Sequence, residues 1–363
     1  MVENKRTPLY DEHVRLNAKI IDFHGWDMPL QYTKILDEHM AVRRHVGMFD
    51  VSHMGDIIVE GKDAASFLDR ILPTKISQLK IGDAAYSAFL NNDGNIIDDT
   101  IVYRLSLDKF FFVPNASMID IIFNWVKENS TGFDVRITNV SDDIACIAIQ
   151  GPESDKVMAD LGISYPGQFK FSLQNSSMAL KTNSITNSKQ LIISGTGYTG
   201  ENGIEILCSS EDAVGVWRSA LESIKRHSGL PCGLGSRDTL RMEKGMLLSG
   251  TDFHGDRNPH ECAISFIVNN DTEFIGKNSL TKGKQVFRGF IIDGKIIPRS
   301  GNTVHNGNIT IGTITSGTLS PILEKSIALG FIDREYSKPG TNVTIRIRDR
   351  YLPAEVSRPK MVP

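Results

Sequence analysis

Residues 191–208 read LIISGTGYTGENGIEILC, and this stretch distinguishes between two possible folds. Its glycines match the GxGxxG pattern of dinucleotide-binding sites, and the apolar run before them is typical of a strand. A dinucleotide site needs a helix after the glycines, because the pyrophosphate binds at the helix N-terminus. Here Gly203 and the β-branched run after it indicate a second strand. The sequence therefore predicts a tight connection between two strands, with glycines at positive φ, rather than a nucleotide site.

The chain on both sides of this stretch mixes helix and strand patterns. Alternating or β-branched runs predict strands at residues 57–59, 84–90, 96–105, 109–115 and 144–151. Apolar residues at helical spacing predict helices at residues 35–45, 64–71, 118–128 and 211–227, and another from near Ser236. These patterns predict two mixed α+β regions.

The C-terminal part of the chain has strand patterns only. Short β-rich runs occupy residues 287–293, 309–317, 327–333, 341–349 and 352–357, and turn residues separate them at short intervals. This arrangement is typical of an antiparallel sandwich or barrel. The expected fold class is α+β, ending in an all-β domain.

Composition argues against several classes of function. The 363 residues include 40 Lys plus Arg and 43 Asp plus Glu, so no basic bias supports nucleic-acid binding. No apolar run has the length of a membrane span and the first residues show no leader pattern, so we expect a cytoplasmic protein. The cysteines form no CxxC pair and no HxH or HExxH group occurs, which predicts buried apolar thiols and no metal site. They are Cys146, Cys208, Cys232 and Cys262.

Asp99 is the most informative single residue. In the strand IIDDTIVYR, alternation places Asp99 on the face of Ile101 and Tyr103, and Asp98 on the opposite face with Arg104. Asp98 is therefore expected on the wetter face and Asp99 among apolar side chains. A carboxylate there must be paired, hydrogen-bonded or shifted in pKa, as in many functional sites. Alternatively, a bulge after the preceding turn leaves Asp99 solvated.

A second candidate lies in residues 233–244, GLGSRDTLRMEK. Ser236 is expected to cap a helix, and Arg237, Arg241 and Lys244 follow at helical spacing. These three cationic side chains either form a solvated stripe along the helix, or Arg237 binds a carboxylate with its planar guanidinium.

Several other residues have two interpretations. Glu205 alternates with apolar neighbours, which marks only the outer face of a strand. Aromatic side chains near these polar residues either flank a flat heterocycle or pack in the core. They are Trp26, Tyr86, Tyr103 and Tyr198.

Taken together and in order, the motifs resemble the glycine cleavage system T-protein (aminomethyltransferase) family over nearly the whole chain. The matching stretches are TPLYDEH, DFHGWDMPLQY, VGMFDVSHMG, GNIIDDTIVYR, IQGP, GTGYTGENGIEI, GLGSRDTLRMEKGM, TSGTLSP and IALGFID. The resemblance implies a three-domain cloverleaf with tetrahydrofolate in a central opening. Its discontinuous first domain is expected at residues 1–53 plus 140–265, an inserted domain at 54–139, and a C-terminal β-barrel domain at 266–363.

The resemblance also implies a reaction. Members of the family transfer the one-carbon unit of an aminomethyl-lipoyl H protein to tetrahydrofolate, releasing ammonia and forming methylenetetrahydrofolate and dihydrolipoyl H protein. The expected partners are folate and the lipoyl-bearing H protein, with no nucleic acid and no membrane. Two alternatives share the fold: a tetrahydrofolate-dependent demethylase of another donor, and a non-enzymatic folate-binding protein.

Matched residue by residue, the resemblance implies specific roles. Asp99 corresponds to the catalytic carboxylate, and Arg237 is expected near it or near the folate tail. Glu205 corresponds to the carboxylate that recognises the pterin. Residues that match the lining of the folate cavity are Met54, Tyr86, Tyr103, Asn115 and Tyr198. One departure concerns Gly195, which replaces an arginine that is usual in the family.

Overall fold

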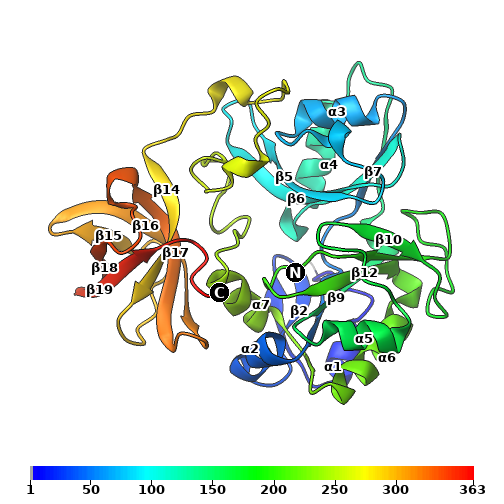
Figure 1. Ribbon diagram of the computed structural model, residues 1–363, viewed down its shortest axis with the longest axis horizontal. Coiled ribbons are helices and arrows are strands. Elements are labelled where there is room, and N and C mark those ends of the chain that lie inside the picture. The colour runs from blue at the N-terminus through cyan, green and yellow to red at the C-terminus, as the bar shows by residue number, and fades with distance from the viewer. Residues whose placement is uncertain (1–2) are drawn as a thin grey trace. The chain divides into compact units, whose positions relative to one another are not determined.

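The computed structural model describes residues 3–363, and their strands form a hairpin, two open sheets and a closed barrel (Figure 1). The chain divides into two compact units. The first contains Met1–Ser87 and Asp99–Arg237, and the second contains Ala88–Asp98 and Asp238–Pro363. The fold class is α+β, as the sequence predicts.

A six-stranded sheet forms the centre of the first unit, in the order β10-β11-β12-β9-β3-β13. The strands are β3 (Gly47–Asp50), β9 (Ile144–Gln150), β10 (Phe171–Gln174), β11 (Leu191–Ser194), β12 (Gly203–Ser209) and β13 (Leu230–Pro231). β11 and β12 are antiparallel, with Ser194 opposite Glu205. GTGYTG therefore joins two strands, as predicted. Positive φ is present only at Gly200 among its glycines, so that part of the prediction is wrong for Gly195 and Gly197.

Helices cover one face of this sheet. The sequence of α6 places apolar residues such as Val216, Trp217 and Ala220 at helical spacing, and all are buried. They pack with α5 residues against the inward side chains of β9, β11 and β12 (Figure 1). The unit's helices include α1 (Tyr10–Arg15), α2 (Ile35–Arg44), α5 (Ser154–Leu161) and α6 (Ala213–Arg226).

The opposite face packs against a five-stranded sheet with the order β5-β6-β7-β4-β8. Its strands are β4 (Ile57–Glu60), β5 (Ala84–Leu90), β6 (Ile96–Arg104), β7 (Lys109–Val113) and β8 (Arg136–Asn139). Tyr103, Phe111 and Leu207 belong to the buried cluster between the sheets. Helices α3 (Ala64–Ile71) and α4 (Ile119–Glu128) contact β7 and β8, and β1 (Lys19–Phe23) with β2 (Trp26–Gln31) forms the hairpin.

The burial of the two faces of β6 is the reverse of the prediction. Asp98 is 0% exposed and lies among the buried positions Ile96 and Val102, whereas Asp99 is partly exposed. The Ser249 hydroxyl donates a hydrogen bond of 2.7 Å to Asp98 Oδ1, which offsets part of the cost of burying this carboxylate. The alternation is confirmed, but the expectation that Asp98 is wetter than Asp99 is wrong.

The second unit contains a closed antiparallel barrel in the order β14-β17-β16-β15-β18-β19 (Figure 1). Its strands are β14 (Gln285–Ile292), β15 (Thr303–Asn306), β16 (Ile309–Ser320), β17 (Lys325–Asp333), β18 (Asn342–Ile347) and β19 (Arg350–Ser357). Pairing of β14 with β19 closes the barrel. The sequence left a sandwich and a barrel open, and the structure has the barrel.

Helix α7 (Leu234–Glu243) corrects two expectations. It already begins at Leu234, so Ser236 lies inside the helix and is not its N-cap. Arg241 is 1% exposed and donates hydrogen bonds to Asp252 (2.7 Å) and Ser316 (2.9 Å). A solvated stripe is therefore the wrong interpretation for Arg241.

The four cysteines are free, and Cys208, Cys232 and Cys262 are buried. Burial raises the pKa of the Cys208 thiol to about 12, so it stays protonated at neutral pH. Within residues 3–363, no group of three or more His, Cys, Asp or Glu side chains is placed to hold a metal ion. Over the same residues, no helix is long and apolar enough to cross a membrane.

Candidate active site

Asp99 is held by two hydrogen-bond donors in the first unit. The Tyr86 hydroxyl donates to Oδ2 at 2.7 Å, and the Asn115 side-chain amide donates to Oδ1 at 2.8 Å. Each carboxylate oxygen therefore has a fixed partner, and Asp99 lies on the partly exposed face of β6. The arrangement presents an oriented negative charge.

The local fold brings these three residues together. Tyr86 lies on β5, the neighbour of β6 in the sheet. Asn115 follows β7, whose Val113 lies opposite Ile101 of β6. The Asn115 amide also donates to the main-chain oxygen of Asp99 at 3.3 Å, which ties the segment after β7 to β6.

Glu205 lies on β12, on the face that packs towards the five-stranded sheet. The Thr196 hydroxyl donates a hydrogen bond to its Oε2. Glu205 also interacts electrostatically with Arg237, where its charge offsets part of the lowering of the Arg237 pKa by burial. The outer face of this strand is thus covered, and Glu205 belongs to a partly buried polar cluster.

Arg237 is the cation of this cluster. Its guanidinium lies 4.6 Å from the centroid of the Tyr198 ring. Its Nη1 is buried and has no hydrogen-bond partner in the described chain, and burial lowers the pKa of the side chain. A buried donor without a partner costs free energy, so Nη1 is suited to a ligand acceptor.

The structure adds two residues that sequence reasoning missed. His53 precedes Met54 and is 3% exposed, and its Nδ1 is buried without a partner in the described chain. Burial and the charge of Arg237 lower the pKa of His53 to about 4. Burial and the charge of Glu205 raise the pKa of Asp56 well above its usual value. The motif VSHMGD contains both residues, but nothing in its pattern predicts their burial.

The predicted residues fall into two groups. Asp99, Tyr86 and Asn115 form the first. The second joins Glu205 with Arg237 by charge, Arg237 with Tyr198 by a cation–π contact, and Tyr103 with Thr196 by a hydrogen bond of 3.2 Å. Tyr103 is buried in the core. Met54 lies in the turn after β3, where its main-chain N–H donates to Val51.

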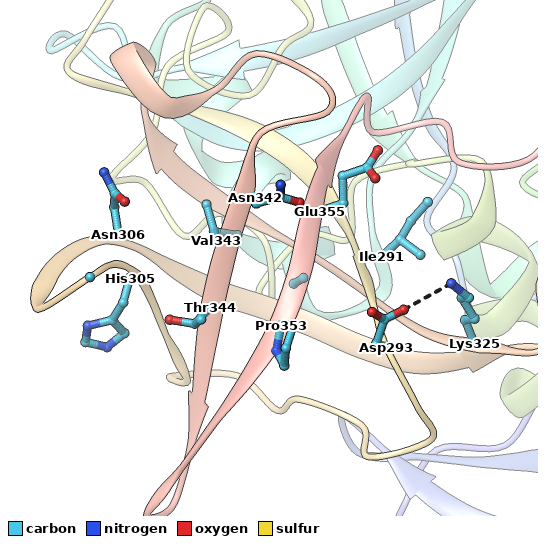
Figure 2. A pocket seen from close by; sticks show the side chains of 12 residues that line it. Ile291, Asp293, His305, Asn306, Lys325, Asn342, Val343, Thr344, Pro353 and Glu355 are labelled. Carbon is cyan, nitrogen blue, oxygen red and sulfur yellow. Dashed lines mark hydrogen bonds and ion pairs between the residues drawn. The ribbon is translucent and has the colours of Figure 1, made fainter.

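A separate cavity of about 470 Å³ lies in the barrel unit. None of the predicted site residues lines it. At one end Lys325 pairs with Asp293 at 3.1 Å (Figure 2). This cavity therefore does not belong to the predicted site.

Comparison with known proteins identifies the family. The chain matches the GCVT N-terminal domain over residues 9–272 and the glycine cleavage T-protein C-terminal barrel domain over residues 285–362. An aminomethyltransferase of Thermotoga petrophila is 43% identical over 91% of this chain and 90% of its own, and one of Halothermothrix orenii is 40% identical over 97% and 98%. The crystal structure of glycine cleavage system aminomethyltransferase T from Bartonella henselae superposes with a TM-score of 0.90 at 30% identity, covering 99% of this chain and 98% of that one. The chain belongs to the aminomethyltransferase family of glycine cleavage T proteins.

Proposed function

We propose that this protein transfers the one-carbon unit of an aminomethyl-lipoyl H protein to tetrahydrofolate, with release of ammonia. The products are 5,10-methylenetetrahydrofolate and dihydrolipoyl H protein. Family membership over nearly the full chain supports the reaction. The observation that carries the site assignment is Asp99, a partly exposed carboxylate with one hydrogen-bond donor on each oxygen.

Asp99 is proposed as the catalytic carboxylate. Positive charge develops on the one-carbon unit as the amine departs, and a fixed negative charge lowers the free energy of that transition state. Because Tyr86 and Asn115 already orient the carboxylate, little reorganisation is needed during the reaction. We also propose that Asp99 shares a proton with the departing amine.

The second group of residues is suited to hold the folate. Glu205 supplies an acceptor for the N–H groups of the pterin, which carboxylates bind well. Arg237 offers an unpartnered Nη1 to a ligand acceptor, and we propose it as a second functional residue. Met54, Tyr86, Asn115 and Tyr198 are proposed to line the folate site, and the buried Tyr103 is proposed to support it.

Three parts of the proposal rest on family membership alone. The lipoyl-bearing H protein is the proposed carrier of the donor, and the cytoplasm is the proposed location. The division into residues 1–53 plus 140–265, 54–139 and 266–363 is the proposed domain organisation.

The reaction is tested by single-turnover release of ammonia from aminomethylated H protein, with and without tetrahydrofolate. We expect release that depends on both this protein and folate. Folate binding without any gain in ammonia release contradicts the proposal. That outcome favours a demethylase of another donor or a non-enzymatic folate-binding protein, and assays with methyl donors separate those two.

A further inference from the structure

A cluster of three hydroxyl groups lies next to Glu205. Those of Ser194 and Thr196 are 2.8 Å apart, and each lies 3.2 Å from the Tyr103 hydroxyl. All three side chains are buried. Only Thr196 reaches the carboxylate, where it donates to Oε2. The three hydroxyls thus contact one another, and Thr196 connects them to Glu205.

The number of available protons determines which hydroxyl donates and which accepts. Each hydroxyl has one proton to donate, and an ionised carboxylate only accepts. Thr196 therefore donates its proton to Glu205 and can only accept from the other two hydroxyls. The Ser194 hydroxyl donates to the Tyr103 hydroxyl, so Tyr103 is left to donate to Thr196. Thr196 is thus the last donor in a chain of buried hydroxyls that runs from Ser194 through Tyr103 to Glu205.

The main chain of Thr196 is fixed as well. The Gln150 side chain donates to the main-chain oxygens of Thr196 and Ile204, each at 3.2 Å. Its oxygen accepts from the Thr199 hydroxyl at 2.9 Å. Gln150 thereby joins the loop that contains Thr196 to β12, the strand that contains Glu205.

We propose that Thr196, oriented by Tyr103 and Ser194, is a positioning residue that holds Glu205 for recognition of the pterin amino group. Thr196 donates to Oε2 of Glu205, and among residues 3–363 no hydrogen bond is made to the other oxygen, Oε1. That oxygen is available to an N–H donor of the ligand. Tyr103 then acts through Thr196 rather than as a contact of its own. This inference rests on the proposed role of Glu205 in folate binding.

The test compares the affinities of two ligands: tetrahydrofolate, and an analogue in which hydrogen replaces the pterin 2-amino group. Thr196→Val removes the hydroxyl at nearly constant volume and is expected to lower the preference for tetrahydrofolate about tenfold. Thr196→Ser should restore it, and Tyr103→Phe should lower it by about threefold. Thr186→Val is the matched control, because its hydroxyl pairs with Ser188 at 2.9 Å rather than with Glu205. Thermal unfolding checks that each variant is folded.

The outcomes separate this inference from the proposed function. Glu205→Gln should abolish most of the preference. If it does, but Thr196→Val and Tyr103→Phe keep the wild-type preference or weaken both ligands equally, the positioning role is wrong. If Glu205→Gln itself leaves the preference unchanged, the pterin role of Glu205 fails, and this inference fails with it. The ammonia-release assay tests the reaction independently.

Discussion

The carboxylate of Asp99 owes its fixed orientation to Tyr86 and Asn115. Asp99→Asn keeps the shape of the side chain and removes its charge. We expect turnover to fall by about 100-fold or more, because the lost interaction acts on charge that develops in the transition state. Tetrahydrofolate affinity should change by less than about threefold. Single-turnover ammonia release and equilibrium folate binding measure the two effects, and undiminished turnover would exclude the catalytic role.

The buried imidazole of His53 predicts a pH dependence of stability. Its pKa is lowered to about 4, while an unfolded histidine titrates near 6.5. Between these values the unfolded state binds more protons, so this residue destabilises the fold as pH falls from 6.5 to 4. The full effect is about 3 kcal/mol.

The comparison that isolates this effect is urea unfolding of the wild type and His53→Gln at pH 7 and pH 4.5. The wild type should lose more stability than the variant on acidification. Asp56 contributes with the opposite sign, because its raised pKa favours the folded state as pH falls, so only the difference between the proteins is informative. Equal losses in both proteins would show that His53 does not titrate in this range.

Single residues also show where sequence reasoning fails. Alternation along β6 places Asp98 and Asp99 on opposite faces, as predicted, but it does not say which face becomes covered. That depends on Ser249, far along the chain, which bonds to Asp98. Arg241 illustrates the same point, since helical spacing alone does not reveal its partner Asp252. Tertiary contacts decided both cases.

The GTGYTG loop depends on close packing around Gln150. A Cβ built on Gly197 would lie 2.0 Å from Gln150 Oε1, which is already hydrogen-bonded. Gly197→Ala should therefore destabilise the protein by about 1–3 kcal/mol. Gly215→Ala is the matched control in the exposed part of α6, where nothing lies within 4 Å, and it should stabilise by about 0.5–1 kcal/mol. Denaturant midpoints of both variants test this packing, and an unchanged midpoint for Gly197→Ala would contradict it.

Elements with a strong apolar pattern were predictable, and their ends were less so. The predicted helix at residues 35–45 corresponds to α2, and the segment at 211–227 contains α6. The start of α7 differs because Glu38 accepts a hydrogen bond of 2.9 Å from the Gly233 N–H. This carboxylate, distant in sequence, stabilises the helix start that Ser236 was expected to cap. No local pattern around Ser236 contains that information.

At the scale of a whole unit, the buried ion pair of Arg241 and Asp252 lies inside the second unit. Asp252→Ala leaves the guanidinium buried without its main carboxylate, so we expect a loss of about 3–5 kcal/mol. Lys325→Ala removes one side of an exposed pair with Asp293 and should change stability by less than about 1 kcal/mol. Urea unfolding compares the two, and similar losses would show that burial does not set their contributions.

For the molecule as a whole, the order of motifs along the chain was the strongest information in the sequence. It identified the family that the comparisons confirm, although the separate patterns left substrate and reaction open. The same order supplied Asp99, Arg237 and Glu205 as site residues. The order of motifs did not indicate His53 and Asp56. These residues are notable because they are buried near charged side chains of other segments, and no local pattern shows this.

The closed barrel has a consequence for incomplete chains. Every barrel strand is paired on both sides, so none presents free main-chain groups. A chain that ends before β19 would expose β14 and β18 together, each with a row of unpaired N–H and C=O groups. Two such edges are templates for pairing between molecules. Loss of residues 350–363 is thus expected to produce a protein that self-associates and precipitates.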